Sequence, residues 1–191
     1  MEKEILELPS RIETKRLLIR KYESGDGKEL FQLLETNNNR EYLKEHIDEA
    51  VSVKTKEDAE NRITELSFDW IDRKRFVMGI WLKSTKKYIG QIWIEPSKWE
   101  VPSFELGWCL DRVCQGQGIA IEAAKAAIQY LFNYLKAYKI IVITRDDNHK
   151  SYKLAERLGF IKEGHLRDHS VKKDGSRVGL LYYGLLKNDC F

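Results

Sequence analysis

The stretch Gln115-Gly116-Gln117-Gly118-Ile119-Ala120 stands directly before the longest helix-like run of the sequence, residues 121–135. A loop with two glycines carries little side-chain bulk, so several main-chain N–H groups can converge on one point. The positive end of the dipole of the following helix adds about half a charge in their support. This junction therefore predicts a binding site for phosphate groups, in particular a pyrophosphate.

The size and composition of the chain narrow the class of protein. At 191 residues it fits one domain with an ordinary core, and its 33 basic and 30 acidic residues are too balanced to indicate a surface for nucleic acid or membrane. The charged start, Met1-Glu2-Lys3-Glu4, has no signal-peptide core, and no apolar run reaches the about 20 residues that span a bilayer. We therefore expect a soluble cytoplasmic protein without direct contact to nucleic acid or membrane.

The cysteines and histidines do not indicate a metal site. Cys109, Cys114 and Cys190 are odd in number and lack a second CxxC or a paired histidine, so we interpret them as reduced thiols. Although His165 and His169 are close in sequence, they lie in a stretch that reads as extended rather than helical. We expect no metal.

The first 75 residues predict a strand followed by helices. Residues 12–20 alternate as a strand, and Ser24-Gly25-Asp26 then offers cap chemistry for a helix that runs to Leu34. Residues 37–75 are polar and rich in charge, with helical spacing in their second part. The apolar positions with that spacing are Ile63, Leu66 and Trp70.

The rest of the chain predicts strands with two helices between them. Three β-rich segments with short links, residues 76–82, 88–95 and 103–110, indicate an antiparallel meander. After the helix at 121–135, residues 139–143 form an apolar run typical of a buried strand.

Asn148 is a suitable cap for a shorter helix that Gly159 ends, and the extended sequence around Asp174-Gly175 indicates a hairpin. The chain has no repeat, linker or low-complexity tract. One mixed α/β (α+β) domain therefore accounts for residues 1–191.

Taken together, these features form a compound pattern: a strand, then Gln-x-x-Gly-x-Ala opening a long helix, then a buried strand, then Asn148-x-x-Ser151 and Glu156-Arg157-Leu158-Gly159-Phe160. The pattern resembles the GNAT superfamily of acetyl-CoA-dependent N-acetyltransferases over about residues 11–186. The resemblance implies a single-domain GNAT fold, with a mixed, mostly antiparallel, twisted sheet of about seven strands and helices on both faces.

Three further segments resemble one branch of that superfamily, the ribosomal-protein N-terminal (alanine/serine) acetyltransferases. They are Glu13-Thr14-Lys15-Arg16-Leu17-Leu18-Ile19-Arg20, Phe104-Glu105-Leu106-Gly107-Trp108 and Glu163-Gly164. This resemblance implies an acceptor amine at the N-terminus of a protein.

The resemblance also implies how acetyl-CoA is held. The strand that ends at Leu110 would splay from the strand at 140–144, leaving a slot for the pantetheine arm. Main-chain groups of Cys109, Leu110 and Arg112 would pair with that arm, and Asn148 and Ser151 would touch the cofactor. The pyrophosphate would be held by the N–H groups of Gln115, Gly116, Gln117, Gly118, Ile119 and Ala120.

Two residues are candidates for catalysis. Glu105 would act as general base through an ordered water, although a polar residue on an exposed strand face is the simpler interpretation of its position. Many members of the superfamily place a tyrosine, acting as general acid, where this chain has Ala155. Tyr152 is not a substitute for it, and Ser151 would donate a hydrogen bond to the departing sulfur instead, although a serine in a first helical turn often only satisfies local backbone groups.

Several questions stay open at this level. Arg112 and Lys150 are candidate partners of cofactor phosphates or ordinary surface charges, and Trp93 and Trp108 line the acceptor cleft or belong to the core. The acceptor is a protein α-amine or a small amine such as a polyamine, amino sugar or antibiotic. Because the usual tyrosine is absent, an acyl-CoA-binding sensor without catalysis is a third alternative. A P-loop nucleotide binder is the weakest alternative, since the lysine and the Ser/Thr expected after the second glycine are absent. The sequence leaves a homodimer open.

Overall fold

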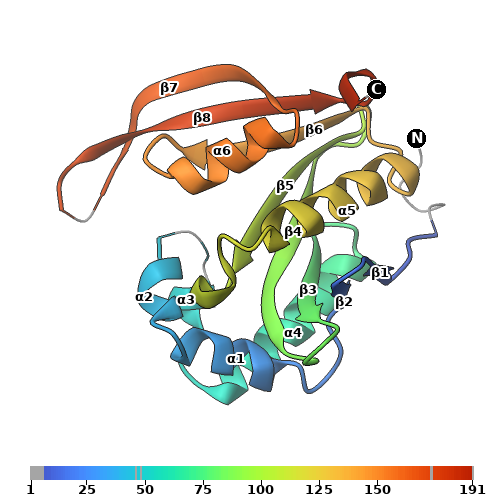
Figure 1. Cartoon of the computed structure of the whole chain (residues 1–191), viewed down its shortest axis with the longest axis vertical. Coiled ribbons are helices and arrows are strands. Elements are labelled where there is room, and N and C mark those ends of the chain that lie inside the picture. The colour runs from blue at the N-terminus through green and yellow to red at the C-terminus, as the bar shows by residue number, and fades with distance from the viewer. Residues whose placement is uncertain (1–6, 46, 48, 173, 191) are drawn as a thin grey trace.

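The computed structural model describes residues 7–45, 47, 49–172 and 174–190. In these residues eight strands form one sheet in the order β1-β2-β3-β4-β5-β6-β8-β7, and every neighbouring pair is antiparallel except β5 and β6 (Figure 1). The strands are β1 (Arg11–Glu13), β2 (Leu17–Lys21), β3 (Phe76–Leu82), β4 (Tyr88–Lys98), β5 (Ser103–Leu110), β6 (Lys139–Arg145), β7 (Ile161–Val171) and β8 (Arg177–Leu186).

The segment 12–20, predicted as one strand, is a hairpin of β1 and β2. Thr14 closes its turn, because the Thr14 N–H donates to the Leu17 carbonyl and the Thr14 hydroxyl accepts from the Leu17 N–H, both at 3.0 Å. Ile12 consequently lies opposite Ile19. The sheet has eight strands rather than about seven because this one predicted strand is divided.

Helices connect β2 to β3 across one face of the sheet. Helix α4 begins with a capping box, in which the Thr55 hydroxyl accepts from the Asp58 N–H and the Asp58 carboxylate accepts from the Thr55 N–H. Helix α1 begins next to the predicted cap residue, but the Asp26 carboxylate accepts hydrogen bonds from Arg20 at 2.7 and 3.0 Å instead of capping. These helices are α1 (Gly27–Glu35), α2 (Asn39–Leu43), α3 (Glu49–Ser52) and α4 (Lys56–Ile71).

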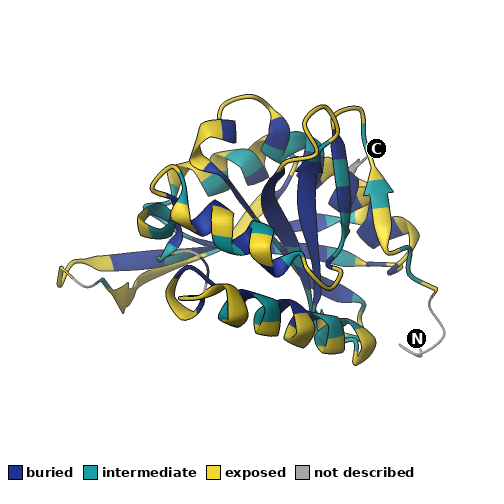
Figure 2. Cartoon of the chain, turned by 90° about the horizontal axis from the view of Figure 1, so that it is seen from below, coloured by how far each residue is buried: buried dark blue, intermediate teal, exposed yellow. Residues whose placement is uncertain are grey.

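The sheet separates two hydrophobic cores, and its central strands are buried between layers of helices (Figure 2). Helices α5 (Ile119–Asn133) and α6 (His149–Arg157) cover one face, and α1 to α4 cover the other. Strand β3 shows the alternation that this requires: Met78 and Ile80 pack in the first core, while Val77 and Trp81 pack in the second. Burial of these apolar side chains is the main favourable contribution to folding.

Strands β5 and β6 pair over a short distance and then separate. Only Ser103, Phe104 and Glu105 of β5 have partners in β6. Beyond Glu105, β5 stays paired with β4 as far as Leu110, and β6 stays paired with β8 as far as Arg145. The predicted splaying of these strands is confirmed, and it divides the sheet at its centre (Figure 1).

The C-terminal part follows the predicted order. Asn148 caps α6, and Gly159, at φ +90°, lets the chain turn into β7. The β7–β8 hairpin projects from the body of the molecule with mostly exposed residues in β7 (Figures 1 and 2). His165 and His169 lie in β7, in extended backbone as predicted. The 3₁₀ segment η2 (Lys187–Cys190) ends the described chain.

Two of the three cysteines are free thiols, Cys109 and Cys114, and both are buried. The side chain of Cys190 and the Met1-Glu2-Lys3-Glu4 segment lie outside the part of the chain that is described. No helix among the described residues combines the length and the apolar character needed to cross a membrane.

Candidate active site

A pocket of about 190 Å³ lies where β5 and β6 separate. The divided sheet supplies two of its walls, and the start of α6 supplies a third. It brings together Glu105 and Ser151, the two predicted catalytic residues, with Trp93 and Trp108. Its lining is Glu45, Trp93, Glu105, Leu106, Gly107, Trp108, Val142, Ile143, Thr144, Arg145, Asn148, Ser151 and Leu180.

Glu105 is half-buried in this pocket, at the last position where β5 pairs with β6. Burial raises the pKa of its carboxyl above the ordinary value, and the negative charge of Glu95 raises it further. Glu95 lies directly opposite Glu105 across β4 and β5, and it forms an ion pair with Arg75 at 2.5 Å. The positive charge of Arg75 offsets part of the rise. A carboxylate of raised pKa in a cleft has the character of a general base.

The indole of Trp93 shapes the floor of the pocket. Trp93 lies opposite Gly107 across β4 and β5, and a Cβ placed on Gly107 would lie only 2.1–2.4 Å from three atoms of that indole. A side chain at position 107 is therefore incompatible with this position of the ring. The ring can occupy this position only because residue 107 is glycine.

Ser151 reaches the pocket from the first turn of α6. The Asn148 side-chain oxygen accepts from the Ser151 N–H at 3.2 Å, as the predicted cap requires, and no described residue hydrogen-bonds to the Ser151 hydroxyl. Ala155, at the position of the missing tyrosine, is fully buried in the core. The hydroxyl of Tyr152 pairs with His149 Nδ1 at 2.7 Å, and Tyr152 does not line the pocket.

The outer wall of the pocket carries a chain of ion pairs that sequence reasoning missed. Arg145, at the end of β6, pairs with Glu45 at 3.0 Å and with Asp147 at 2.8 Å. Asp147 in turn pairs with Lys172 at 3.0 Å, and these partners hold the pKa of the Asp147 carboxyl well below its ordinary value. The Glu45–Arg145 pair joins the segment after α2 to the far side of the divided sheet. No local signal could have found it, since its two residues are distant in sequence.

The glycine loop lies beyond the end of β5, between the 3₁₀ segment η1 (Arg112–Cys114) and α5. Gly116 and Gly118 have φ of +75° and +72°, a conformation that side-chain-bearing residues rarely adopt. The Gln115 N–H, also expected to bind the pyrophosphate, instead donates to the Arg112 carbonyl at 3.3 Å. Within the described chain, the N–H groups of residues 116–120 find no acceptor. Unpaired N–H groups at the start of a helix are suited to an anion.

Main-chain groups at the end of β5 differ in their availability. The Asp111 N–H donates to the Ile89 carbonyl of β4. Successive residues of a strand direct their backbone N–H and C=O groups alternately to its two neighbours, so the backbone groups of Cys109 also face β4. Those of Leu110 face the side from which β6 has departed. The Arg112 N–H donates to the Asn39 side-chain oxygen at 2.9 Å. Of the three residues expected to pair with pantetheine, only Leu110 presents free main-chain groups toward the slot.

Asp111, directly after β5, is a further residue of this region that sequence reasoning missed. It is fully buried, and its carboxylate accepts from Asn37 at 2.9 and 3.0 Å, from Asn39 at 3.0 Å and from Lys87 at 3.2 Å. Burial raises the pKa of the Asp111 carboxyl, but the hydrogen bonds from Asn39, Asn37 and Lys87 outweigh this, so the pKa is lowered. The Asn37-Asn38-Asn39 triplet, with positive φ at Asn37 and Asn38, is the sequence signal that could have indicated a special turn here.

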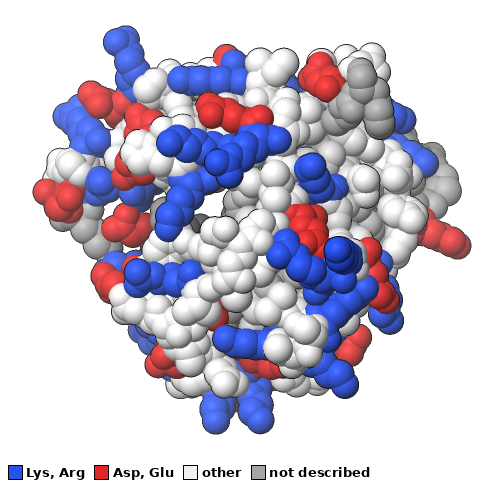
Figure 3. All heavy atoms as spheres, viewed as in Figure 1, with Lys and Arg blue, Asp and Glu red and all other residues white. Residues whose placement is uncertain are grey.

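Basic side chains lie at the rim of the slot. Lys150 donates to the Gln115 side-chain oxygen at 2.7 Å, which links α6 to the glycine loop. Lys150 and Arg112 both lie near the ring of Tyr42, at 5.5 and 5.7 Å from its centroid. Figure 3 shows Lys and Arg side chains gathered over α6, beside a hollow in this face of the molecule. Positive charge is thus available next to the loop.

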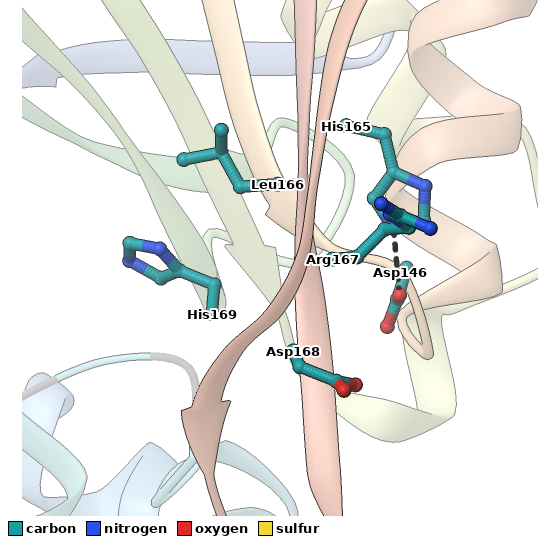
Figure 4. Close-up of a pocket in the computed structure, with 6 residues that line it drawn as sticks. All are labelled: Asp146, His165, Leu166, Arg167, Asp168 and His169. Carbon is teal, nitrogen blue, oxygen red and sulfur yellow. Dashed lines mark hydrogen bonds and ion pairs between the residues drawn. The ribbon is translucent and has the colours of Figure 1, made fainter.

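A second, larger hollow lies at the outer edge of the sheet, with a volume of about 860 Å³ (Figure 4). His165 Nε2 and Asp146 Oδ2 form a hydrogen bond of 2.9 Å there, while Leu166 and His169 point to the other side of β7. This hollow is open, and it contains neither Glu105 nor Ser151. The smaller pocket is therefore the candidate active site. The described residues hold no group of His, Cys, Asp and Glu side chains suited to a metal ion.

Comparison with known sequences agrees with this geometry. The model of the family described as the acetyltransferase (GNAT) domain matches residues 16–161. The chain is 31% identical over 176 residues to the uncharacterized N-acetyltransferase p20 of Bacillus licheniformis, and the match covers 92% of this chain and 96% of that protein.

Solved structures show the same fold. The microcin C7 self immunity acetyltransferase MccE, in complex with acetyl-CoA and AMP, has a TM-score of 0.82 at 22% identity, covering 93% of this chain and 97% of that one. RimL, a ribosomal L7/L12 alpha-N-protein acetyltransferase in complex with coenzyme A, has a TM-score of 0.82 at 18% identity, covering 96% and 99%.

Proposed function

Because the chain belongs to the GNAT acetyltransferase family, and so is an acetyl-CoA-dependent N-acetyltransferase, we propose that its acceptor is the N-terminal α-amine of a protein, such as a ribosomal protein. The acetyl group passes directly from the thioester to the amine, with Glu105 as general base and Ser151 as hydrogen-bond donor to the departing sulfur. The raised pKa of Glu105, in the pocket between the separated strands, is the observation that carries the proposal.

The residues present suit acetyl-CoA, which brings the activated acetyl group as a thioester. The free N–H groups of the loop at 116–120 hold the pyrophosphate. Main-chain groups of Leu110 pair with the pantetheine amides in the slot, and Asn148 lies at the end of the slot next to Ser151. Lys150 and Arg112 supply positive charge at the rim.

Glu105 prepares the amine for attack. An α-ammonium has a reference pKa of about 7.7–8.0, against about 10.4 for a lysine side chain. Proton transfer from such a group to a carboxylate costs free energy. The cost is smaller when burial has raised the pKa of the carboxyl, as it has for Glu105. Glu105 therefore accepts the proton through an ordered water, and the neutral amine attacks the thioester.

Ser151 acts at the other end of the reaction. Its main-chain N–H is used by the cap of α6, which leaves its hydroxyl as a donor toward the pocket. The buried thiols do not take the acetyl group themselves, because burial raises the pKa of Cys109 to about 12 and also raises that of Cys114. Both thiols therefore stay protonated, which favours direct transfer.

The carboxylates of the pocket favour an acceptor with one ammonium group. Two carboxylates line it, Glu45 and Glu105, and Glu45 already pairs with Arg145. A polyamine carries several ammonium groups and needs several unpaired carboxylates. Glu105 by itself suits a single amine, and the about 190 Å³ of the pocket suits the first residue of a chain. RimL, which has the same fold, is an acetyltransferase of a protein α-amine.

A screen of acceptors tests the proposal. Peptides that begin with free Ala or Ser, the same peptides with blocked N-termini and an internal lysine, spermidine and amino sugars are each incubated with acetyl-CoA. We expect turnover with the free N-termini and none with the blocked ones. Turnover with small amines alone would overturn the proposal, and tight coenzyme A binding without turnover of any acceptor would favour the sensor alternative.

A further inference from the structure

The turn between β1 and β2 contacts the glycine loop, although the two lie far apart in sequence. Arg16 Nη1 donates to the Gln117 carbonyl at 2.9 Å, and Arg16 Nε donates to the Glu122 carboxylate at 2.6 Å. The Arg16 N–H donates to the same carboxylate at 2.9 Å, and so does the Thr14 hydroxyl at 2.6 Å. Arg16, Thr14 and Glu122 thus tie the turn to the loop and to the first turn of α5.

The contact with Gln117 determines which way the neighbouring N–H points. The carbonyl of Gln117 and the N–H of Gly118 belong to one planar trans peptide, so they point in opposite directions. Since Arg16 holds the carbonyl on its own side, the Gly118 N–H points away from Arg16. Rotation of this peptide changes ψ of Gln117 and φ of Gly118. Gly118, at φ +72°, has no side chain to oppose that rotation, so the peptide needs a restraint from elsewhere.

Glu122 would by itself oppose an anion at this helix start. Burial raises the pKa of its carboxyl, but hydrogen bonds from Thr14 and Arg16 outweigh this and lower the pKa, so Glu122 is ionised. A carboxylate in the first turn stabilises the helix but repels a phosphate nearby. Arg16 balances that charge and, through the same guanidinium, restrains Gln117.

We propose that Arg16, oriented by Glu122 and Thr14, is a positioning residue that holds the loop at 116–120 in the conformation that binds the pyrophosphate of the acetyl donor. The role belongs to the donor side of the site and does not depend on which amine is the acceptor. Arg16 acts through the peptide of Gln117 and Gly118, and its fork geometry matters more than its charge.

Kinetics with two donors test the proposal. Arg16→Lys and Arg16→Ala are compared with wild type using acetyl-CoA and using S-acetylpantetheine, a donor that lacks the pyrophosphate. We expect KM for acetyl-CoA to rise by about tenfold or more, as the loss of hydrogen bonds to charged groups implies, with kcat nearly unchanged. KM for S-acetylpantetheine should not change, and Arg11→Ala, which removes an exposed ion pair of the same hairpin, should match wild type.

Glu122→Gln gives a second test, because a positioning role and a simple charge effect predict opposite changes in the affinity for coenzyme A. Removal of a negative charge near the phosphates should strengthen coenzyme A binding if charge alone matters, whereas loss of the Arg16 restraint should weaken it. We expect weaker binding by calorimetry, and equally so for coenzyme A and 3′-dephospho-coenzyme A, because the pyrophosphate is the group affected. Stronger binding by Glu122→Gln, or an equal rise of KM for both donors in the Arg16 variants, would overturn the proposal. If Arg16→Ala does not fold, the measurements on Arg16→Lys and Glu122→Gln test the proposal without it.

Discussion

Glu105 lies opposite Ile141 at the last position where β5 and β6 pair, so the candidate base stands at the point where the sheet begins to divide. Its backbone is held by the sheet on both sides, while its side chain faces the pocket. The fold thereby places a partly desolvated carboxylate on rigid backbone next to the slot.

Glu105→Gln should lower kcat by about 10²–10⁴-fold, the usual contribution of a general base, without loss of coenzyme A binding. Wild-type kcat/KM should rise with pH through the raised pKa of Glu105, and the variant should lack that limb. The measurement is a pH–rate profile together with a binding titration. A variant that keeps wild-type rates would assign the proton transfer elsewhere.

Glu95→Gln should shift the rise of kcat/KM with pH, which follows the ionisation of Glu105, to lower pH. The Glu95 charge raises the pKa of Glu105, and its removal also leaves Arg75, which lowers that pKa, without its ion-pair partner. Both changes favour the ionised form of Glu105. A pH–rate profile checks this, and we expect kcat on its plateau to stay within about threefold of wild type, because Glu95 does not line the pocket.

Glu105→Gln should also stabilise the protein at neutral pH. Because the folded-state pKa of Glu105 lies above its unfolded value, ionisation costs stability once the pH exceeds the folded pKa, and this cost is absent below the unfolded pKa. The variant should therefore gain on the order of 1 kcal/mol in the free energy of unfolding at pH 7. Urea melts should show the gain shrinking toward pH 4.5, and a gain independent of pH would contradict this account.

Ser151→Ala should lower kcat by about 10- to 100-fold, the value of a hydrogen bond to a developing charge, and leave the thermal midpoint nearly unchanged. The cap of α6 survives, because Asn148 accepts from the main-chain N–H of residue 151. Ser170→Ala in β7 is the matched control. An unchanged kcat would show that the sulfur is protonated from another source.

Gly107→Ala should destabilise the protein by about 1–3 kcal/mol, because its Cβ would overlap the Trp93 indole. Trp93→Leu removes that overlap, so the double variant should be more stable than the sum of the single variants predicts. Thermal melts of the four proteins in the cycle check the coupling. Additive effects would show that the two residues do not touch in solution.

Asp111→Asn should cost about 2–3 kcal/mol at neutral pH, since its donors Asn37, Asn39 and Lys87 lose a charged acceptor. The folded-state pKa of Asp111 is lowered, so its contribution is complete above the unfolded pKa and is lost as the pH falls through the folded pKa. Denaturant melts should show a constant difference between variant and wild type above pH 5 and a smaller one in acid.

Local signals predicted much of this fold. The glycines before α5, the β-rich segments of β3 to β5 and the Asn148 cap each depend on residues adjacent in sequence, and each is confirmed. The contacts that could not be predicted are long-range: Arg16 and Glu122 are 106 residues apart, and Glu45 meets Arg145 only after the sheet has formed. The β1–β2 turn was missed because Thr14 ends the first strand through its hydroxyl, while the alternation continues past it.

The division between β5 and β6 also bears on how such a site changes in evolution. An extended arm with two amides, laid beside Leu110, would take the place of a strand and be held through backbone groups that every residue possesses. Side chains that line the pocket, such as Trp93, Glu45 and Arg145, would not be needed to hold that arm. Drift at these positions can therefore alter the choice of amine while the donor is retained, so one scaffold can serve new acceptors through few substitutions.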